Sequence, residues 1–283
     1  MSIAVKENYI KTWLVTGDTH GRLLSRLYDI RSHLPDTVSS NQVGVIILGD
    51  VGINYYNNNR ENFIKQEICQ TGFNIYCVRG NHEMRPQDVK GITKMYDEEV
   101  CGDIYIQPDF PNICYFKDFG IYTLGGYIVG IIGGAYSVDK YYRIQNNLGW
   151  FENEQLSAEE MKECIEYFKN QRVDFMLSHT CPLSWQPVDM FLSSINQSTV
   201  DNSMEKMLET IKNEETFNWG IWLFGHYHND RLERPHVEMY FNYFETLDAI
   251  HERWLDYDAD LLSGKEYQSI RWMHKSPNFY KGV

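Results

Sequence analysis

The stretch Val78-Arg79-Gly80-Asn81-His82-Glu83 follows an apolar, aromatic run, Phe73 to Cys77, that predicts a buried strand. Gly80 suits a sharp turn of the backbone where the chain leaves the sheet. Asn81 offers a neutral oxygen to a cation, and His82 can carry a proton near neutral pH. A single block of this kind is more often an ordinary turn, so its meaning depends on whether the pattern recurs.

The same order of an apolar strand, usually a glycine, and then Asp or His occurs four more times. The four stretches are Leu14-Val15-Thr16-Gly17-Asp18-Thr19-His20-Gly21, Val45-Ile46-Ile47-Leu48-Gly49-Asp50, Phe175-Met176-Leu177-Ser178-His179 and Ile221-Trp222-Leu223-Phe224-Gly225-His226-Tyr227-His228. Each predicted strand thus ends in a side chain that can bind a metal. In open α/β sheets ligands collect outside the carboxyl ends of the strands, so we expect these side chains to meet.

The first third of the chain alternates predicted strands and helices. Strands are predicted at 12–16, 43–48 and 73–78, with helices at about 22–34 and from about 60 to 70 between them. This order is typical of a parallel sheet covered by helices. Between about 101 and 138 the segments become short and glycine-punctuated, which predicts mostly antiparallel hairpins at 103–107, 114–116, 121–124 and 128–133.

The second half continues the pattern with longer spacings. Ser157 to Glu160 forms a capping box that begins a helix, and strands are predicted at 174–177, 220–224 and 237–243. A helix through Met204, Leu208 and Ile211 separates the first two of these strands. We expect a terminal helix packed through Trp254, Leu255, Leu261 and Leu262, with the last ten residues loosely held. Without a linker, the chain is expected to form a single domain over 1–283, with a motif core at about 12–230 and a C-terminal extension at about 246–283.

Composition restricts the partners. The 283 residues are 43% hydrophobic and carry a net charge of -13, which argues against binding bulk nucleic acid or anionic membranes. The longest uncharged stretch, 121–138, is too short and too rich in glycine to span a membrane. The six cysteines show no C-x-x-C spacing, and residues 1–11 have no apolar core of signal-peptide length, so we expect reduced thiols and a cytoplasmic location.

The candidate metal ligands form a mixed nitrogen and oxygen set without a thiolate: Asp18, His20, Asp50, Asn81, His179, His226 and His228. Such a set suits Mn, Fe, Zn, Co or Ni rather than a dedicated Mg or Ca site. Seven ligands are too many for one ion unless a carboxylate bridges two, and two ions about 3.5–4 Å apart can clamp a phosphate. Each residue also has an ordinary explanation, such as a helix cap, a turn or a hydrogen-bonded buried histidine. Five blocks occurring together favour the metal site.

These blocks resemble the calcineurin-like metallophosphoesterase superfamily, whose Gly-Asp-x-His-Gly, Gly-Asp, Gly-Asn-His-Glu, His and Gly-His-x-His motifs occur here in family order over about residues 12–230. The resemblance implies an α/β fold with four layers, an αββα sandwich of two central mixed β-sheets flanked by helices. It also implies a dinuclear metal site at the C-terminal ends of the strands. The cofactors would be two divalent transition-metal ions, with Mn favoured.

The resemblance also assigns roles. Asp18, His20 and His228 would hold the first metal, Asp50 would bridge, and Asn81, His179 and His226 would hold the second. The implied reaction is in-line attack on phosphorus by a hydroxide that bridges the metals. His82 would act as general acid or help to position the phosphate.

The chain departs from one branch of the family. Protein Ser/Thr phosphatases follow the bridging Asp with Val-Asp-Arg-Gly, whereas Asp50 is followed here by Val51-Gly52-Ile53-Asn54. The Asp partner of the catalytic His is therefore absent at Ile53, and so is the phosphate-binding Arg. Another cation must replace that Arg if a monoester dianion is bound, and the candidates are Arg143, favoured, Arg22 and Arg79. Tyrosine-rich stretches at 55–56 and 141–142 would either line a substrate cleft or simply pack.

The leading hypothesis is thus a metal-dependent phosphohydrolase acting on a phosphorylated small molecule, a nucleotide or a phosphoprotein. The sequence leaves monoesterase and diesterase unresolved, because the missing Arg favours diesters and the Arg-Gly-Asn-His-Glu block favours the phosphatase branch. The first alternative is a catalytically inactive scaffold or binding protein with the same fold, although such a protein would be expected to have lost ligands. The second is a metal-storage or sensing module, which would not need His82.

Overall fold

The computed structural model of the protein describes residues 9–263. Its first sheet has seven strands in the order β13-β1-β2-β3-β6-β5-β4. The strands are β1 (Thr12–Thr16), β2 (Val43–Ile47), β3 (Asn74–Cys77), β4 (Thr93–Asp97), β5 (Gly102–Ile106), β6 (Ile113–Phe116) and β13 (Phe244–Thr246). Strands β1, β2, β3 and β6 are parallel, and β13, β5 and β4 pair antiparallel at the two sides.

The second sheet has six strands in the order β11-β12-β10-β9-β8-β7. They are β7 (Phe119–Leu124), β8 (Tyr127–Ile132), β9 (Arg172–Ser178), β10 (Asn218–Phe224), β11 (Arg231–Arg234) and β12 (Val237–Met239). Strands β8, β9, β10 and β12 are parallel, while β7 and β11 are antiparallel to their neighbours. The expected hairpin region is therefore antiparallel only in part, because β6 continues the parallel row of β3 and β8 begins that of β9.

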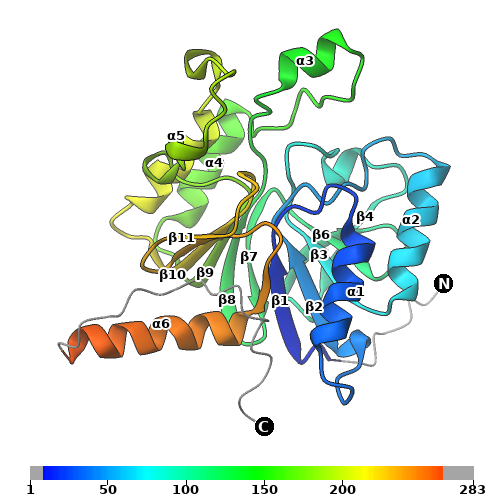
Figure 1. The fold of residues 1–283 in the computed structure, drawn as a ribbon, viewed down its shortest axis with the longest axis horizontal. Helices are drawn as coiled ribbons and strands as arrows, with labels where there is room; N and C mark the ends of the chain where they lie inside the picture. Colours follow the sequence, from blue (N-terminus) through cyan, green and yellow to red (C-terminus); the bar gives the residue numbers. More distant parts are fainter. Residues whose placement is uncertain (1–8, 264–283) are drawn as a thin grey trace.

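The two sheets pack face to face with helices on both outer faces, which confirms the four-layer α/β architecture (Figure 1). Helices α1 (Leu23–His33) and α2 (Asn59–Gln70) cover the first sheet, and α4 (Ala158–Phe168) and α5 (Ser203–Lys212) cover the second. The predicted capping box begins α4, with Ser157 Oγ accepting from the Glu160 N–H at 3.2 Å and Glu160 accepting from the Ser157 N–H at 2.7 Å. Short 3-10 helices at 40–42, 86–88, 183–185, 188–190 and 197–199 lie in the loops.

Strand alternation divides the apolar side chains between three cores. In β1, Trp13 and Val15 face the second sheet, where Phe175 and Leu177 of β9 meet them. Leu14, between them, faces the helices α1 and α2. A third core lies between the second sheet and the helices α4 and α5. Because the central strands are covered on both faces, they read as continuous apolar runs.

The C-terminal part differs from the prediction in two ways. The strand expected at 237–243 covers only β12 at 237–239, because the chain crosses at 240–243 to the other sheet, where β13 begins at Phe244. The carboxylate of Asp230 holds this crossing by accepting three consecutive backbone N–H groups, those of residues 241–243. In α6 (Leu247–Leu262) the buried residues are Leu247, Ile250 and Trp254, whereas Leu255, Leu261 and Leu262 are exposed.

Figure 1 shows α6 at the opposite end of the molecule from the short helix α3 (Lys140–Gln145). Together with β13, α6 joins residues 244–262 to the first sheet and to the core between the sheets. Residues 264–283, which include the rest of the expected extension and the last ten residues, lie outside the described part. Within residues 9–263 no helix combines the length and the apolar character needed to cross a bilayer.

Candidate metal centre

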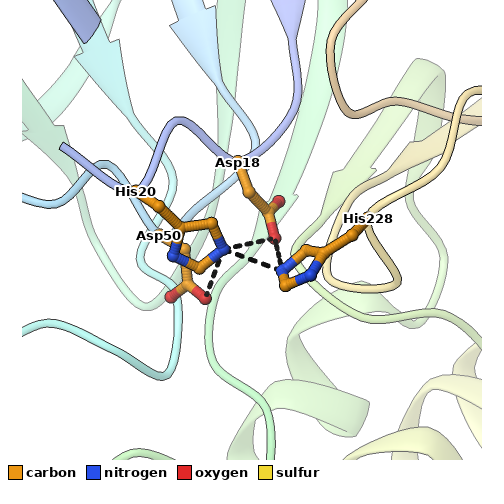
Figure 2. A group of neighbouring side chains, drawn as sticks. All are labelled: Asp18, His20, Asp50 and His228. Carbon is orange, nitrogen blue, oxygen red and sulfur yellow. Dashed lines mark hydrogen bonds and ion pairs between the residues drawn. The ribbon is translucent and has the colours of Figure 1, made fainter. Parts of the chain in front are cut away.

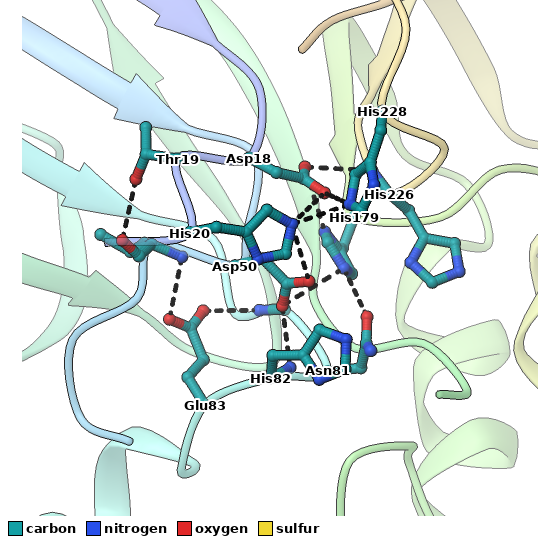
Figure 3. Close-up of polar contacts among 12 residues, drawn as sticks. Asp18, Thr19, His20, Asp50, Asn81, His82, Glu83, His179, His226 and His228 are labelled. Carbon is teal, nitrogen blue, oxygen red and sulfur yellow. Dashed lines mark hydrogen bonds and ion pairs between the residues drawn. The ribbon is translucent and has the colours of Figure 1, made fainter. Parts of the chain in front are cut away.

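The seven predicted ligands come from loops that follow β1, β2, β3, β9 and β10, at the carboxyl ends of the parallel strands. The loops after β1 and β2 are bonded to each other, since the N–H groups of Thr19 and His20 donate to the carbonyl of Asp50 at 3.2 and 2.8 Å. The Thr19 hydroxyl donates to the carbonyl of Val51 at 2.8 Å (Figure 3). These bonds hold the first two motifs in a fixed relative position.

The first group of candidate ligands, which we call the first ligand group, consists of Asp18, His20 and His228 (Figure 2). The Nε2 atoms of His20 and His228 are 2.7 Å apart, and the Asp18 Oδ2 lies 3.8 and 3.4 Å from them. The Asp18 side chain is fully buried, while those of His20 and His228 are 34% and 50% exposed. This group therefore lies at the mouth of the site.

The second group of candidate ligands, which we call the second ligand group, consists of Asn81, His179 and His226. The Nδ1 of His179 lies 2.6 Å from the carbonyl oxygen of Leu48, so this nitrogen must carry the hydrogen and donate it. In the neutral ring the Nε2 lone pair then faces the Oδ1 of Asn81 at 2.8 Å. The rings of His179 and His226 are 5.0 Å apart. Asn81 and His179 are buried, so this group lies deeper than the first.

Asp50 lies between the two groups, as Figure 3 shows. Its Oδ2 is 3.9 Å from His20 Nε2, and its Oδ1 is 3.7 Å from His179 Nε2. The same Oδ1 accepts the backbone N–H of His82 at 2.8 Å. Burial opposes ionisation of Asp50, but the imidazoles of His179, His82 and His20 outweigh it and hold its pKa below the ordinary value. The position fits a carboxylate shared by two cations.

The glycines of the motifs allow the ligands to approach the strand ends. A Cβ at Gly80 would lie 2.1 Å from Asp50 Oδ1, one at Gly49 would lie 2.2 Å from His179 Nδ1, and one at Gly225 would lie 2.4 Å from Asp18 Oδ1. Gly80 is thus required for space, not for the sharp turn that the sequence suggested. The left-handed backbone is adopted instead by four of the candidate ligands, His20, Asp50, His226 and His228, with φ between 44° and 69°. Backbone strain of this kind gathers at functional sites.

The donor set fits divalent transition metals. The Oδ2 of Asp18 is buried and has no hydrogen-bond partner among the described residues, although an isolated buried carboxylate oxygen is costly. The Nε2 atoms of His20 and His228 lie 2.7 Å apart in the first group, and in the second group the Nε2 lone pair of His179 faces an amide oxygen at 2.8 Å. A cation bound to each group would satisfy these atoms, and imidazole with carboxylate is a ligand set of first-row metals.

Burial and neighbouring charges shift the pKa values of several side chains in and around the two groups. Burial, followed by the repulsion of His179, lowers the pKa of His226 well below its ordinary value. Interaction with the neighbouring Asp18 carboxylate, 3.4 Å away, raises the pKa of His228. Burial and the charge of Asp50 raise the pKa of Glu83 to about 8, although Glu83 accepts the backbone N–H groups of Gly80 and Val51 at 2.7 and 3.2 Å. By accepting from both Gly80 and Val51, Glu83 joins the loop after β3 to the loop after β2.

His82 lies beside the first ligand group, with its ring 5.9 Å from that of His20. Burial lowers its pKa, and Asp50 partly offsets this effect. The position that supplies an Asp partner in protein phosphatases, Ile53, is buried in the core between the first sheet and its helices. Among the described residues no group hydrogen-bonds the His82 ring, and Asp139 is the next acidic residue after Asp50 whose charge raises its pKa.

A cavity of about 650 Å³ opens beside the first ligand group. Its wall includes His20, His82 and Arg143, together with Gly21, Gly52, Tyr55, Tyr56, Asn58, Arg60, Glu61 and Ile64. Arg143 is held by Asp139, at 2.7 Å from its Nε, and by the Tyr55 hydroxyl, at 2.8 Å from its Nη1. The favoured substrate-binding candidate thus faces the cavity that adjoins the ligands.

The other two candidate arginines are placed differently. Arg79 is buried, paired with Asp118, and donates to the backbone carbonyl of Glu154 at 2.6 Å, so it holds the structure together and does not reach the cavity. Arg22 is exposed just before α1 and is not part of the cavity wall. Asn54, at the position of the family's phosphate-binding Arg, is buried and accepts from Lys65.

The residues that shape the cavity include several without a sequence signal. Glu61 accepts the backbone N–H groups of Tyr55, Tyr56 and Asn57 at 2.7, 2.6 and 2.5 Å, which fixes the loop that carries the two tyrosines. Arg60, exposed on the cavity wall, looks like any other surface charge in the sequence. Both residues lie in the first turn of α2, the helix that follows the Gly49-Asp50 motif. Their position close after this motif is the sequence feature that could have identified them as residues near the site.

Comparison with protein families agrees with this geometry. The model of the calcineurin-like phosphoesterase family matches residues 12–230, which contain all seven candidate ligands and His82. The chain therefore belongs to the calcineurin-like phosphoesterases, a family whose members generally bind two divalent metal ions. No curated protein is significantly similar to the chain.

Proposed function

We propose that the protein hydrolyses phosphate monoesters in a reaction that depends on two divalent metal ions, with Mn²⁺ the favoured pair. The observation that carries the proposal is that seven candidate nitrogen and oxygen ligands lie at the carboxyl ends of strands of both sheets, beside a cavity lined by His82 and Arg143. Asp18, His20 and His228 would hold one ion, Asn81, His179 and His226 the other, and Asp50 both. The bound ions would bind the phosphoryl oxygens and acidify the attacking water.

The chain's own residues would supply the remaining steps. Arg143 faces the cavity with its Nη2 free of hydrogen bonds among the described residues, so this group can donate to a phosphoryl oxygen. Since Asn54 points toward Lys65, Arg143 is the cation that would replace the family's Arg. A guanidinium beside the metals favours a dianionic monoester over a diester.

His82 would donate a proton to the leaving oxygen from the cavity side. Its pKa is lowered by burial, which makes the imidazolium a stronger acid, and the charge of a bound phosphate would favour its protonation. Tyr55 and Tyr56 would contact the group that carries the phosphate. That group belongs to a small molecule, a nucleotide or a phosphoprotein, and with a net charge of -13 a bulk nucleic acid is disfavoured. We further propose that the activity is cytoplasmic and that the chain forms one domain over 1–283.

The test is hydrolysis of para-nitrophenyl phosphate and of its bis-ester by metal-stripped protein reconstituted with Mn²⁺. We expect Mn²⁺-dependent turnover with preference for the monoester. His82→Ala should lower kcat by about 10²–10⁴-fold with both ions retained. Arg143→Ala should raise KM for the monoester by about 10-fold or more, since a hydrogen bond to a charged group contributes about 1.5–3 kcal/mol. His33→Ala, a histidine on α1 outside the cavity, is the matched control.

Three outcomes distinguish the hypotheses. Faster turnover of the bis-ester would replace the monoesterase by a phosphodiesterase. Two bound ions with turnover unaffected by His82→Ala would remove His82 from the reaction. Two bound ions with no turnover of any phosphoester would favour a scaffold or metal-sensing role.

A further inference from the structure

Residues 138–153, which we call the arm, leave the body between β8 and α4 and carry α3. Figure 1 shows α3 standing clear of the two-sheet body, and α3 has no buried residue. The two residues that flank the arm are different, because Ser137 and Glu154 are 1% and 2% exposed. An exposed excursion of the chain is therefore closed at a buried base.

The base is closed by a set of hydrogen bonds with a defined direction. The two carboxylate oxygens of Glu154 accept the backbone N–H and the hydroxyl of Ser137, at 3.0 and 2.5 Å. Because the Ser137 hydroxyl hydrogen is directed to Glu154, its oxygen is left to accept. The Nδ2 of Asn81 donates to this oxygen at 2.8 Å. The chain of bonds thus runs from the metal-ligand candidate Asn81 through Ser137 to Glu154.

This direction determines which end of the Asn81 amide faces the centre. An amide has an oxygen that can bind a cation and an NH₂ group that cannot. With its NH₂ group bound to Ser137, Asn81 presents Oδ1 toward His179 Nε2 at 2.8 Å. If the Ser137 hydroxyl were free to rotate toward Asn81, it would donate to Oδ1 equally well, and the amide orientation would no longer be fixed.

Two buried arginines hold Glu154 in place from behind. Arg79 donates to the carbonyl of Glu154 at 2.6 Å. Arg85 donates to the carbonyls of Asn153 and Gln155 at 2.9 and 2.7 Å. Three consecutive carbonyls are thus bound by the arginines that flank the Gly80–Glu83 block. The base of the arm cannot move without breaking this set.

We infer that Ser137 and Glu154 are positioning residues for the second metal: they fix the amide of Asn81 with its oxygen toward the ion and tie the arm that carries Arg143 to the second ligand group. The inference rests on the proposed metal-dependent function. The arm is held at its far end as well, by the bond from Arg143 to the Tyr55 hydroxyl. Outer hydrogen bonds of this kind set ligand orientation, and their loss typically weakens metal binding about 10–100-fold.

The test is a titration of metal-stripped protein with Mn²⁺. Calorimetry measures the affinity of each ion, and electron paramagnetic resonance distinguishes a single Mn²⁺ ion from a coupled pair. The wild type should bind two ions. Ser137→Ala and Glu154→Gln should weaken one of them about 10–100-fold and leave the other unchanged. Glu152→Gln, which removes an exposed carboxylate two residues from Glu154, is the matched control and should titrate like the wild type.

Hydrolysis then separates a positioning role from a structural one. At Mn²⁺ concentrations that fill both sites, kcat of Ser137→Ala should return to within a few fold of the wild type. Two equally tight ions in both variants would overturn the inference while leaving the proposed function intact. Equal weakening of both ions, with a lower melting temperature, would show a structural role only. A wild type that binds no Mn²⁺ would overturn inference and proposed function together, whereas two ions without hydrolysis would overturn the function alone.

Discussion

The two ligand groups of the candidate metal centre differ in the contacts that position their side chains. In the first group the imidazoles of His20 and His228 are partly exposed, and their nitrogens lie against each other and Asp18. In the second group His179 is fully buried and bonded to the Leu48 carbonyl, and Asn81 is bonded to Ser137. The two imidazoles of the first group therefore contact mainly each other and Asp18, whereas His179 and Asn81 of the second group are oriented by the surrounding fold.

This difference indicates that the second ligand group is positioned when the chain folds, whereas the first takes up its final geometry when a metal binds. Buried ligands that are held by outer hydrogen bonds are already oriented before the ion binds. Water therefore competes little with them for the bound ion. Exposed imidazoles lose side-chain freedom when they bind, and that entropy opposes binding. We therefore expect the ion in the second group to be held more firmly, and the ion at the mouth to exchange.

The largest effect should come from a change at Asp50, which lies between the two ligand groups. Asp50→Asn keeps the size of the side chain and an oxygen that can accept the His82 N–H, so the fold should survive. It removes the charge shared by the two ions, whose electrostatic contribution is several kcal/mol, and each 1.4 kcal/mol is a factor of ten. We expect kcat/KM for para-nitrophenyl phosphate to fall by about 10³-fold or more, with Mn²⁺ content measured alongside. Asp36→Asn, an exposed carboxylate, is the control, and a loss under tenfold would contradict a bridging role.

A smaller effect should separate the groups by stability. His179→Ala deletes a fully buried ring and leaves the Leu48 carbonyl without its donor, which should lower the free energy of unfolding by about 1–3 kcal/mol. His228→Ala deletes a half-exposed ring and should change it by about 0.5 kcal/mol or less. Urea denaturation of the two metal-free variants measures both values. Equal destabilisation would mean that the two groups are equally part of the fold, and the comparison would fail.

The sequence predicts the ligands better than their surroundings, for a physical reason. The candidate ligands lie in the loops that follow five strands, so local pattern and the rule for strand ends predict where Asp18, Asp50, Asn81, His179 and His226 lie without knowledge of tertiary contacts. The four-layer fold follows from the family resemblance. Elements with little apolar signal were missed: α3 has no buried residue, and β4 is largely exposed.

The roles of the arginines could not be predicted from the local sequence. Arg79 is adjacent to the motif, but its direction is set by Asp118 and Glu154, which are distant in sequence. Arg143 reaches the cavity because of bonds to Tyr55, 88 positions away. The bond from Asn81 to Ser137 likewise spans 56 positions. Spacing along the chain carries no information about such pairs, so only the folded structure distinguishes a substrate-facing cation from a structural one.

The smallest effect, a difference in rates, tests the comparison most directly. When protein loaded with two Mn²⁺ ions is mixed with excess chelator, release should occur in two phases of equal amplitude, because the ion at the half-exposed mouth is reached before the buried one. His228→Ala should lack the fast phase, since it removes a ligand of the first group, and Asn81→Ala should lack the slow phase. Stopped-flow detection of the Mn²⁺–chelator complex measures both rates. A single phase in the wild type, or a fast phase that persists in His228→Ala, would show that the two ions leave as a unit, and the coupling through Asp50 would then outweigh the difference in burial.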